Sequence, residues 1–307
     1  MLLTVFVLLG LLAASLHGKV LPVILWHGMG DSAEGMGPLA DAIRAAVPEA
    51  LVHAVRVGKS PGDDRKRGYL DNATSQVAEV CTQLTADPAL GGSPEGVTMI
   101  GFSQGGLLAR ALVHTCAGIR VRRLITWASP HQGIADLPPT WCARQPVWCS
   151  AARAAVRRGA YLPAVQRSII QAAYVKDPAK LDAYLAGNLF LPVLNNERRD
   201  AAINATVRNQ FARLERVVLV RHANDTVLSP RDTAWFSEPA SRDGASTPVT
   251  NTTLWTRDTI GLRHLHEKGR LSFVDVPNDH MQFSIQQFLD VALLVIAPND
   301  VKFVHQP

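Results

Sequence analysis

The residues GFSQG at positions 101–105 have the spacing of a serine nucleophile held on a sharp turn. In this G-x-S-x-G pattern the serine lies between a strand and a helix, and the glycines let neighbouring backbone approach without a Cβ clash. An apolar run precedes the segment and a helical pattern follows it. We therefore interpret Ser103 as the nucleophile of an acyl-transfer reaction. The alternative is a tight turn that contains an incidental serine.

Such a serine needs a general base and a carboxylate that orients the base, and on this arrangement they follow in the order Ser, Asp, His. His280 lies in a loop between an apolar strand and the last helix, where the base is expected. Asp225 follows the apolar run at residues 216–220 and is the first candidate for the acid. Asp232 and Asp275 remain as alternatives.

The negative oxygen that forms during acyl transfer needs two backbone N–H donors. One donor is expected from the residue after the nucleophile, which is Gln104. The other is expected from the loop HGMG after the first strand, and we select Met29. His27 precedes the serine in the chain, so we interpret it as a structural histidine rather than the base.

The surrounding sequence alternates between buried strands and helices, which predicts an α/β fold with a mostly parallel sheet and helices on both faces. Strands are expected at residues 22–26, 51–57, 96–101, 121–127, 216–220 and 271–276, and helices near 36–47, 71–84, 107–116 and 283–296. Residues 137–211 are mostly helical and contain no good strand. We therefore expect a catalytic domain at residues 19–307 with a helical cap insertion at about 137–212.

The composition excludes several classes of protein. With 307 residues and 47% apolar side chains, the chain is too apolar for a disordered protein. Its net charge of +5 is scattered, with the densest basic spots at residues 65–67 and 153–158. No nucleic-acid motif is present. The basic excess indicates either an ordinary solvated surface or a surface that contacts anionic membranes or acidic partners.

The first residues indicate export. MLLTVFVLLGLLAA is too short for a permanent membrane span, so residues 1–18 are predicted to be a secretory signal peptide. The alternative is an N-terminal strand or helix of the fold. Four Asn-x-Ser/Thr sequons are consistent with an exported glycoprotein; they are centred on Asn72, Asn204, Asn224 and Asn251.

Four cysteines are an even number, as expected for an exported chain with disulfides. Cys142 and Cys149 are seven residues apart with a proline between them, which suits a small closed loop. That choice leaves Cys81 to pair with Cys116. No C-x-x-C spacing occurs, so neither zinc nor another metal is expected, and no cofactor is implied.

These motifs together resemble the palmitoyl-protein thioesterases, lysosomal enzymes of the α/β-hydrolase fold that remove long-chain acyl groups from cysteine. The resemblance covers the chain from about residue 21 to residue 296. It rests on five segments in the same order: WHGMGDS at 26–32, GFSQGG at 101–106, HQG at 131–133 with Leu137-Pro138, Asn224-Asp225 with Trp235-Phe236, and DHMQ at 279–282. One departure is Ala33-Glu34, where family members can carry adjacent cysteines.

The resemblance implies specific roles for residues of this chain. It implies Ser103, Asp225 and His280 as nucleophile, acid and base, with Met29 and Gln104 as oxyanion donors. The same two disulfides are implied, Cys81–Cys116 and Cys142–Cys149, in agreement with their spacing.

The activity implied is hydrolysis of palmitoyl thioesters through an acyl-serine intermediate. The substrates would be S-acylated proteins or peptides and fatty acyl thioesters, with transient contact to a membrane surface, no nucleic acid and no obligate partner. The implied location is the secretory pathway, with the lysosome or vacuole, or secretion, as destination. The alternatives are a lipase or carboxylesterase acting on oxygen esters, and a non-catalytic binding member of the fold.

Overall fold

The computed structural model describes residues 20–137, 142, 147–198 and 202–296. The signal peptide expected at residues 1–18 lies outside these described residues. Among the helices of the described chain, none combines the length and apolar character needed to cross a bilayer.

The centre of the molecule is a sheet of six parallel strands in the order β2-β1-β3-β4-β5-β8. Helices cover both sides of it, so its strands are buried and read as continuous apolar runs. This confirms the predicted α/β class. The strands are β1 (Val23–Trp26), β2 (Val52–Ala54), β3 (Val97–Phe102), β4 (Val121–Trp127), β5 (Arg216–His222) and β8 (Leu271–Val276).

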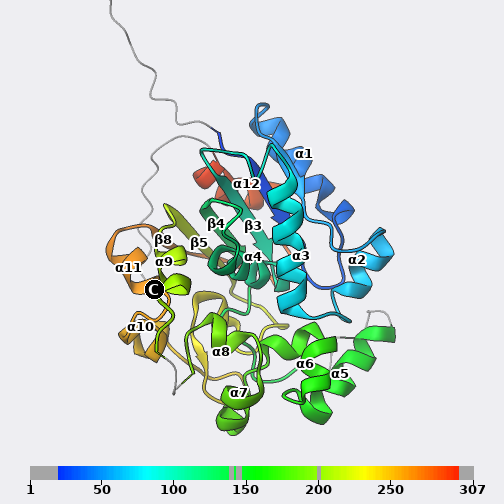
Figure 1. Ribbon diagram of the computed structural model, residues 1–307, viewed down its shortest axis with the longest axis vertical. Helices are drawn as coiled ribbons and strands as arrows, with labels where there is room; N and C mark the ends of the chain where they lie inside the picture. The colour runs from blue at the N-terminus through cyan, green and yellow to red at the C-terminus, as the bar shows by residue number, and fades with distance from the viewer. Residues whose placement is uncertain (1–19, 138–141, 143–146, 199–201, 297–307) are drawn as a thin grey trace, which may run out of the picture.

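Two groups of helices pack on the two faces of the sheet (Figure 1). On the face turned toward the viewer, α4 (Gln104–Thr115) contacts β3 and β4 and is flanked by α3 (Ala73–Ala86) and α9 (Ala205–Ala212). On the other face, α12 (Ile285–Ile296) contacts β4 and packs against α1 (Gly37–Ala46). Asn72 caps α3 by accepting a hydrogen bond from the Ser75 N–H.

Two local features differ from the sequence prediction. The second strand is shorter than expected, because the N–H groups of Val57 and Gly58 donate to the carboxylate of Asp64 instead of continuing the sheet. Asp64 belongs to a helix that was not predicted, α2 (Pro61–Arg67), which starts at the N-cap Ser60. The remaining short elements lie outside the sheet: η1 (Glu34–Met36), η5 (Arg231–Trp235), β6 (Glu238–Pro239), β7 (Ser246–Thr247), η6 (Val249–Asn251), α10 (Thr253–Thr256) and α11 (Leu262–Glu267).

Between β4 and β5 the chain forms a block that we call the helical insertion, residues 147–198 of the described chain. It lies beyond one end of the sheet, at the bottom of the view in Figure 1. Its only pairing with extended chain among the described residues is a single bridge between Ile134 and Val175. Its elements are α5 (Val147–Gly159), α6 (Pro163–Ser168), η3 (Ile170–Tyr174), η4 (Pro178–Lys180), α7 (Leu181–Gly187) and α8 (Leu191–Leu194).

Buried charges hold the insertion to the rest of the molecule. The Lys176 ammonium lies 3.0 Å from a carboxylate oxygen of Glu197 and 2.8 Å from one of Glu238. Burial lowers the pKa of Lys176, but the two glutamates outweigh burial and hold that pKa above its ordinary value. The buried guanidinium of Arg110 on α4 donates to the Asn195 side chain over 2.8 Å. Removing one partner would leave an unpaired buried charge, which is costly.

Both predicted disulfides are present. Cys81 near the end of α3 is bonded to Cys116, the residue that follows α4. Cys142 is bonded to Cys149 in the first turns of α5. The longer bridge joins the helix that follows Ser103 to its neighbour on the same face of the sheet.

The packing of Gly105 gives a first prediction. Helix propensity alone favours Gly105→Ala by about 1 kcal/mol. However, a Cβ at this position would lie 2.2 Å from the carbonyl oxygen of His27. Overpacking of this kind typically costs about 1–3 kcal/mol, so we expect a net loss of stability and a lower Tm.

The matched control is Gly62→Ala in the first turn of α2, where a Cβ would meet only the Ser60 Oγ, at an ordinary contact distance of 3.9 Å. We expect this change to leave Tm unchanged or higher in the same thermal unfolding experiment. A Gly105→Ala protein as stable as the Gly62→Ala protein would contradict the prediction.

Candidate active site

Ser103 occupies a strained turn between β3 and α4. Its backbone φ is +50°, a conformation that residues other than glycine rarely adopt. The turn is held because the Ser103 N–H donates to the Trp127 carbonyl over 2.7 Å, while the Ser103 carbonyl accepts from Gly106 over 3.0 Å. Gly28, in the loop after β1, lies against this turn: a Cβ there would be 3.3 Å from Ser103 Cβ.

The structure brings the three predicted triad residues into one hydrogen-bonded chain. Ser103 Oγ is 2.9 Å from His280 Nε2, and His280 Nδ1 is 2.7 Å from Asp225 Oδ2. The Asp225 side chain is 1% exposed, and its other oxygen accepts the N–H groups of Val227 and Leu228. A buried, fixed carboxylate selects the histidine tautomer with its proton on Nδ1, which leaves Nε2 free to accept the serine proton.

The two alternative carboxylates lie elsewhere. Asp232 and Asp275 both pair with the guanidinium of Arg221, at 2.6 Å and 2.9 Å. That guanidinium also stacks on the ring of Trp235, 3.6 Å from the ring centre. Both carboxylates are therefore held by an arginine, and the geometry favours Asp225 over them.

Asp279, next to the histidine, joins the two loops that carry the acid and the base. One of its oxygens accepts the His280 N–H over 2.7 Å and the Thr226 N–H over 2.8 Å, and the Thr226 hydroxyl donates to both oxygens. Burial raises the pKa of Asp279, but these hydrogen bonds and the nearby charge of His280 outweigh it and hold that pKa below its ordinary value. This role is not expected from the sequence pattern, although an aspartate beside the base offers a local signal.

A cavity of about 500 Å³ opens beside Ser103 and His280. Met29, one expected oxyanion donor, lines it. Gln104, the other, starts α4, where backbone N–H groups have no acceptor within the helix. Five apolar side chains form much of the remaining wall: Met36, Leu39, Phe102, Met281 and Phe283.

The side chain of Gln104 has a structural role that the sequence does not indicate. Its amide donates to the Gly68 carbonyl over 3.1 Å. Its oxygen accepts from Gln171 and from the Tyr174 hydroxyl, both over 3.0 Å. These partners lie 36 to 70 residues away in the chain, so no local pattern could have identified them. The turn at the nucleophile is thereby bonded to the helical insertion.

Asp64 is a second residue that sequence analysis missed. Its carboxylate is fully buried and accepts the N–H of Ala33 over 2.9 Å, in addition to those of Val57 and Gly58. It therefore fixes the loop that follows Met29. His27 is buried beside it, with Nε2 3.9 Å from the same carboxylate, which agrees with a structural histidine.

The four sequons lie at the surface to different degrees. Asn204, Asn224 and Asn251 are exposed, whereas Asn72 is half-buried and its amide donates to the Gln166 carbonyl. Within the described residues, no group of three or more His, Cys, Asp or Glu side chains is arranged to hold a metal ion.

A parallel sheet with a serine on a strained strand-to-helix turn, bonded through histidine to a buried aspartate, defines a serine hydrolase of the α/β-hydrolase class. A family model described as palmitoyl protein thioesterase matches residues 22–280. The chain belongs to this family of thioesterases.

Individual relatives agree with this assignment. Palmitoyl-protein thioesterase 1 of Caenorhabditis elegans is 34% identical over 86% of this chain and 87% of its own. Palmitoyl-protein thioesterase 3 of Dictyostelium discoideum is 31% identical over 92% of both chains. The lysosomal thioesterase PPT2 homolog of Drosophila melanogaster is 30% identical over 84% of this chain and 85% of its own.

The bonds of Asp279 give a second prediction. Asp279→Ala removes the acceptor shared by the loops of Asp225 and His280, and a misplacement of about 1 Å at a reacting centre can cost about 100-fold in rate. We expect kcat for a thioester to fall about 10- to 100-fold with KM little changed. Because the pKa is lowered, the ionised acceptor persists at mildly acidic pH and is lost only as pH falls through that lowered value.

The control is Asp243→Ala, which removes the same charge from an exposed turn between β6 and β7. Steady-state kinetics of both variants across acidic pH would test the idea. Wild-type kcat in the Asp279→Ala protein would show that the two loops hold their places without this carboxylate.

Proposed function

We propose that this chain removes long-chain fatty acyl groups, such as palmitoyl, from S-acylated cysteine in proteins or peptides. The supporting observation is the hydrogen-bonded chain from Ser103 to Asp225 beside a partly apolar cavity, in a member of a thioesterase family. The relatives' names support the same substrate class.

The reaction proceeds in two halves. His280 takes the proton of Ser103 as its Oγ attacks the thioester carbonyl, and Asp225 stabilises the protonated imidazole. The C–S bond then breaks, the leaving sulfur takes the proton from His280 and departs as a thiol, and the acyl group remains on Ser103. Water then attacks this ester with His280 again acting as base, which releases the fatty acid and restores the serine.

The N–H groups of Met29 and Gln104 stabilise the oxyanion in both halves. Loss of one such donor typically costs about 100- to 1,000-fold in rate. A cysteine thiol has a pKa of about 8.5, so it leaves with little help from a general acid. An alcohol needs more help, which favours thioesters over oxygen esters at this site.

The apolar wall of the cavity suits the acyl chain. Burial of each methylene contributes about 0.8 kcal/mol, so a wall that includes Leu39 and Phe283 favours a long chain over a short one. We propose that the helical insertion, within about residues 137–212, acts as a cap next to this site. The bonds from Gln171 and Tyr174 to Gln104 support that arrangement.

We further propose that the protein enters the secretory pathway through the signal peptide at residues 1–18 and reaches a lysosome or vacuole, or is secreted. Two disulfides support an oxidising environment during folding. The sequons at Asn72, Asn204, Asn224 and Asn251 and the relatives named as lysosomal thioesterases support the same route.

The decisive test is hydrolysis of a palmitoyl-cysteine thioester by wild type and Ser103→Ala. Loss of the nucleophile of such a triad costs about six orders of magnitude in kcat, so we expect no measurable turnover with an unchanged circular dichroism spectrum. A palmitoyl oxygen ester assayed in parallel should be hydrolysed more slowly by wild type. Activity of Ser103→Ala within tenfold of wild type would rule out Ser103 as the nucleophile.

The choice of acid gives a further prediction. Asp225→Asn should lower kcat by about four orders of magnitude, because it favours the wrong histidine tautomer. Asp232→Asn should stay near wild type, since that carboxylate pairs with Arg221. The sequon at Asn224 survives the first change, so glycan occupancy, checked by mass spectrometry, should be equal. The reverse pattern of rates would identify Asp232 as the acid.

A further inference from the structure

The charge of the chain is concentrated in and before the helical insertion. Residues 137–176 contain six Lys or Arg and no Asp or Glu. The whole chain has 31 basic and 26 acidic side chains, so outside this stretch 25 basic side chains face 26 acidic ones. The net charge of +5 therefore arises from this one stretch, in which Lys176 is buried and paired with Glu197 and Glu238 while three of the arginines are exposed.

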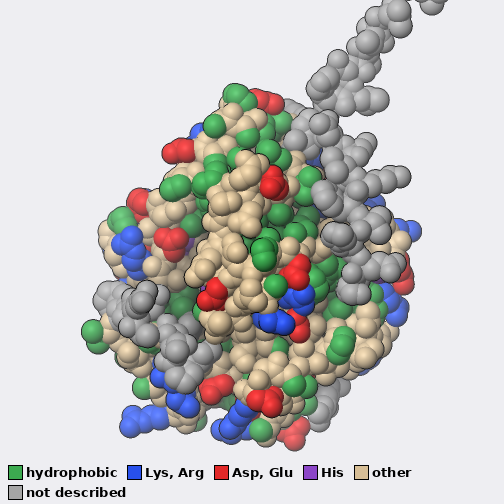
Figure 2. Space-filling view, turned by 180° about the vertical axis from the view of Figure 1, so that it is seen from behind, with side chains coloured by type: hydrophobic (Ala, Val, Ile, Leu, Met, Phe, Trp, Pro, Cys, Tyr) green, Lys and Arg blue, Asp and Glu red, His purple; other side chains and the backbone are tan. Residues whose placement is uncertain are grey.

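The outward surface of α5 and α6 combines basic and apolar side chains. Arg157, Arg158 and Arg167 are exposed, and seen from behind, basic side chains gather at the lower left edge of the molecule, where α5 lies (Figure 2). Val147 is 84% exposed and Leu162 is 56% exposed. Basic side chains beside exposed apolar ones are the composition of a surface that binds anionic membranes.

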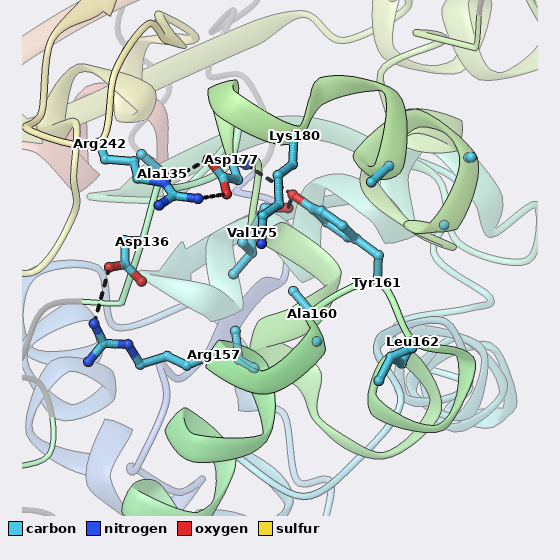
Figure 3. Close-up of a pocket in the computed structure, with 15 residues that line it drawn as sticks. Ala135, Asp136, Arg157, Ala160, Tyr161, Leu162, Val175, Asp177, Lys180 and Arg242 are labelled. Carbon is cyan, nitrogen blue, oxygen red and sulfur yellow. Dashed lines mark hydrogen bonds and ion pairs between the residues drawn. The ribbon is translucent and has the colours of Figure 1, made fainter.

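A cavity of about 570 Å³ opens within this region, and none of the three triad residues lines it (Figure 3). Leu162, Lys180 and two arginines are among its lining residues. Arg157 is 3.9 Å from Asp136, and Arg242 donates to Asp177 over 3.0 Å, so each arginine has an acidic partner. The side chain of Lys180 is exposed.

We propose that this region docks the enzyme onto membranes that contain anionic lipids. We call it the basic face and define it by Val147, Arg157, Arg158, Leu162, Arg167 and Lys180. Lipid phosphates and carboxylates meet its cations, and Val147 and Leu162 enter the headgroup boundary. The benefit to the enzyme rests on the proposed substrates, whose acyl chains reside in membranes, but the docking itself requires no hydrolysis.

Vesicle flotation of the full mature protein tests the proposal without any substrate. We expect binding to vesicles of phosphatidylcholine with phosphatidylserine and none to phosphatidylcholine alone. Binding should weaken as salt is raised, because the screening length falls from about 10 Å at 0.1 M to about 3 Å at 1 M. Absence of binding, or equal binding to both vesicles, would overturn the proposal.

Two pairs of substitutions distinguish the effect of charges on the basic face from the effect of the net charge of the protein on vesicle binding. Arg157→Gln with Arg158→Gln should weaken binding about 30-fold, which corresponds to about 2 kcal/mol for two cations near the surface. Arg65→Gln with Lys66→Gln is the matched control. It removes the same charge from two exposed neighbours, also in the last turn of a helix, and should change little. Equal weakening by both pairs would overturn the proposal.

Leu162→Ser tests the apolar contribution. Serine is a favoured N-cap residue and Leu162 is the N-cap of α6, so the helix is not weakened. We expect binding to phosphatidylserine vesicles to fall about tenfold, consistent with loss of part of the transfer energy of a leucine. Binding of Leu162→Ser to phosphatidylserine vesicles at the wild-type level would show that Leu162 does not enter the headgroup boundary and would overturn the apolar part of the proposal.

Every variant is also assayed with a water-soluble acyl thioester, for which wild-type rates are expected. This comparison keeps the two proposals apart. Vesicle binding with no thioesterase activity would contradict the proposed function alone, and activity without binding would contradict the docking alone.

Discussion

The backbone at Ser103 adopts a φ of +50°, and the surrounding structure has to hold it there. A non-glycine residue in this region costs about 1–3 kcal/mol and persists only where its neighbours over-determine it. Here the Trp127 carbonyl in β4 accepts the Ser103 N–H. Gly105 has no Cβ, which lets the His27 carbonyl after β1 lie directly against α4. This strained turn places the Ser103 side chain beyond the end of β3, within hydrogen-bonding distance of His280.

The other parts of the site reach Ser103 because all six strands run in the same direction. The loops that follow β1, β3, β5 and β8 therefore all lie at the carboxyl ends of the strands, which is where open α/β sheets bind ligands. Met29, Ser103, Asp225 and His280 each come from one of these loops. Two further carboxylates, Asp64 and Asp279, accept backbone N–H groups and hold neighbouring loops together. The loops that carry the site residues are therefore preorganised.

The strands could be read from the sequence because they are buried on both faces and appear as short apolar runs between turns. The turn at Ser103 could also be predicted, because the spacing of the two glycines around the serine follows from the backbone geometry of such a turn. The acid was harder, because Asp225, Asp232 and Asp275 are the same residue type. Only the folded structure shows that Asp225 lies 2.7 Å from His280 Nδ1, whereas the other two pair with Arg221. The 3-10 turns of the insertion and the partners of Gln104 depend on contacts distant in the chain, which no local pattern encodes.

The bonds of Gln104 limit how far the two parts of this enzyme can vary independently. Its side-chain oxygen is buried and takes both its donors, Gln171 and Tyr174, from the insertion. An acceptor left without donors costs about 1–3 kcal/mol, and here the cost would fall on the residue next to the nucleophile. A chimera that replaced the insertion with that of another hydrolase would therefore need matching donors for this oxygen. The insertion and the turn at the nucleophile are thus coupled through the side chain of Gln104.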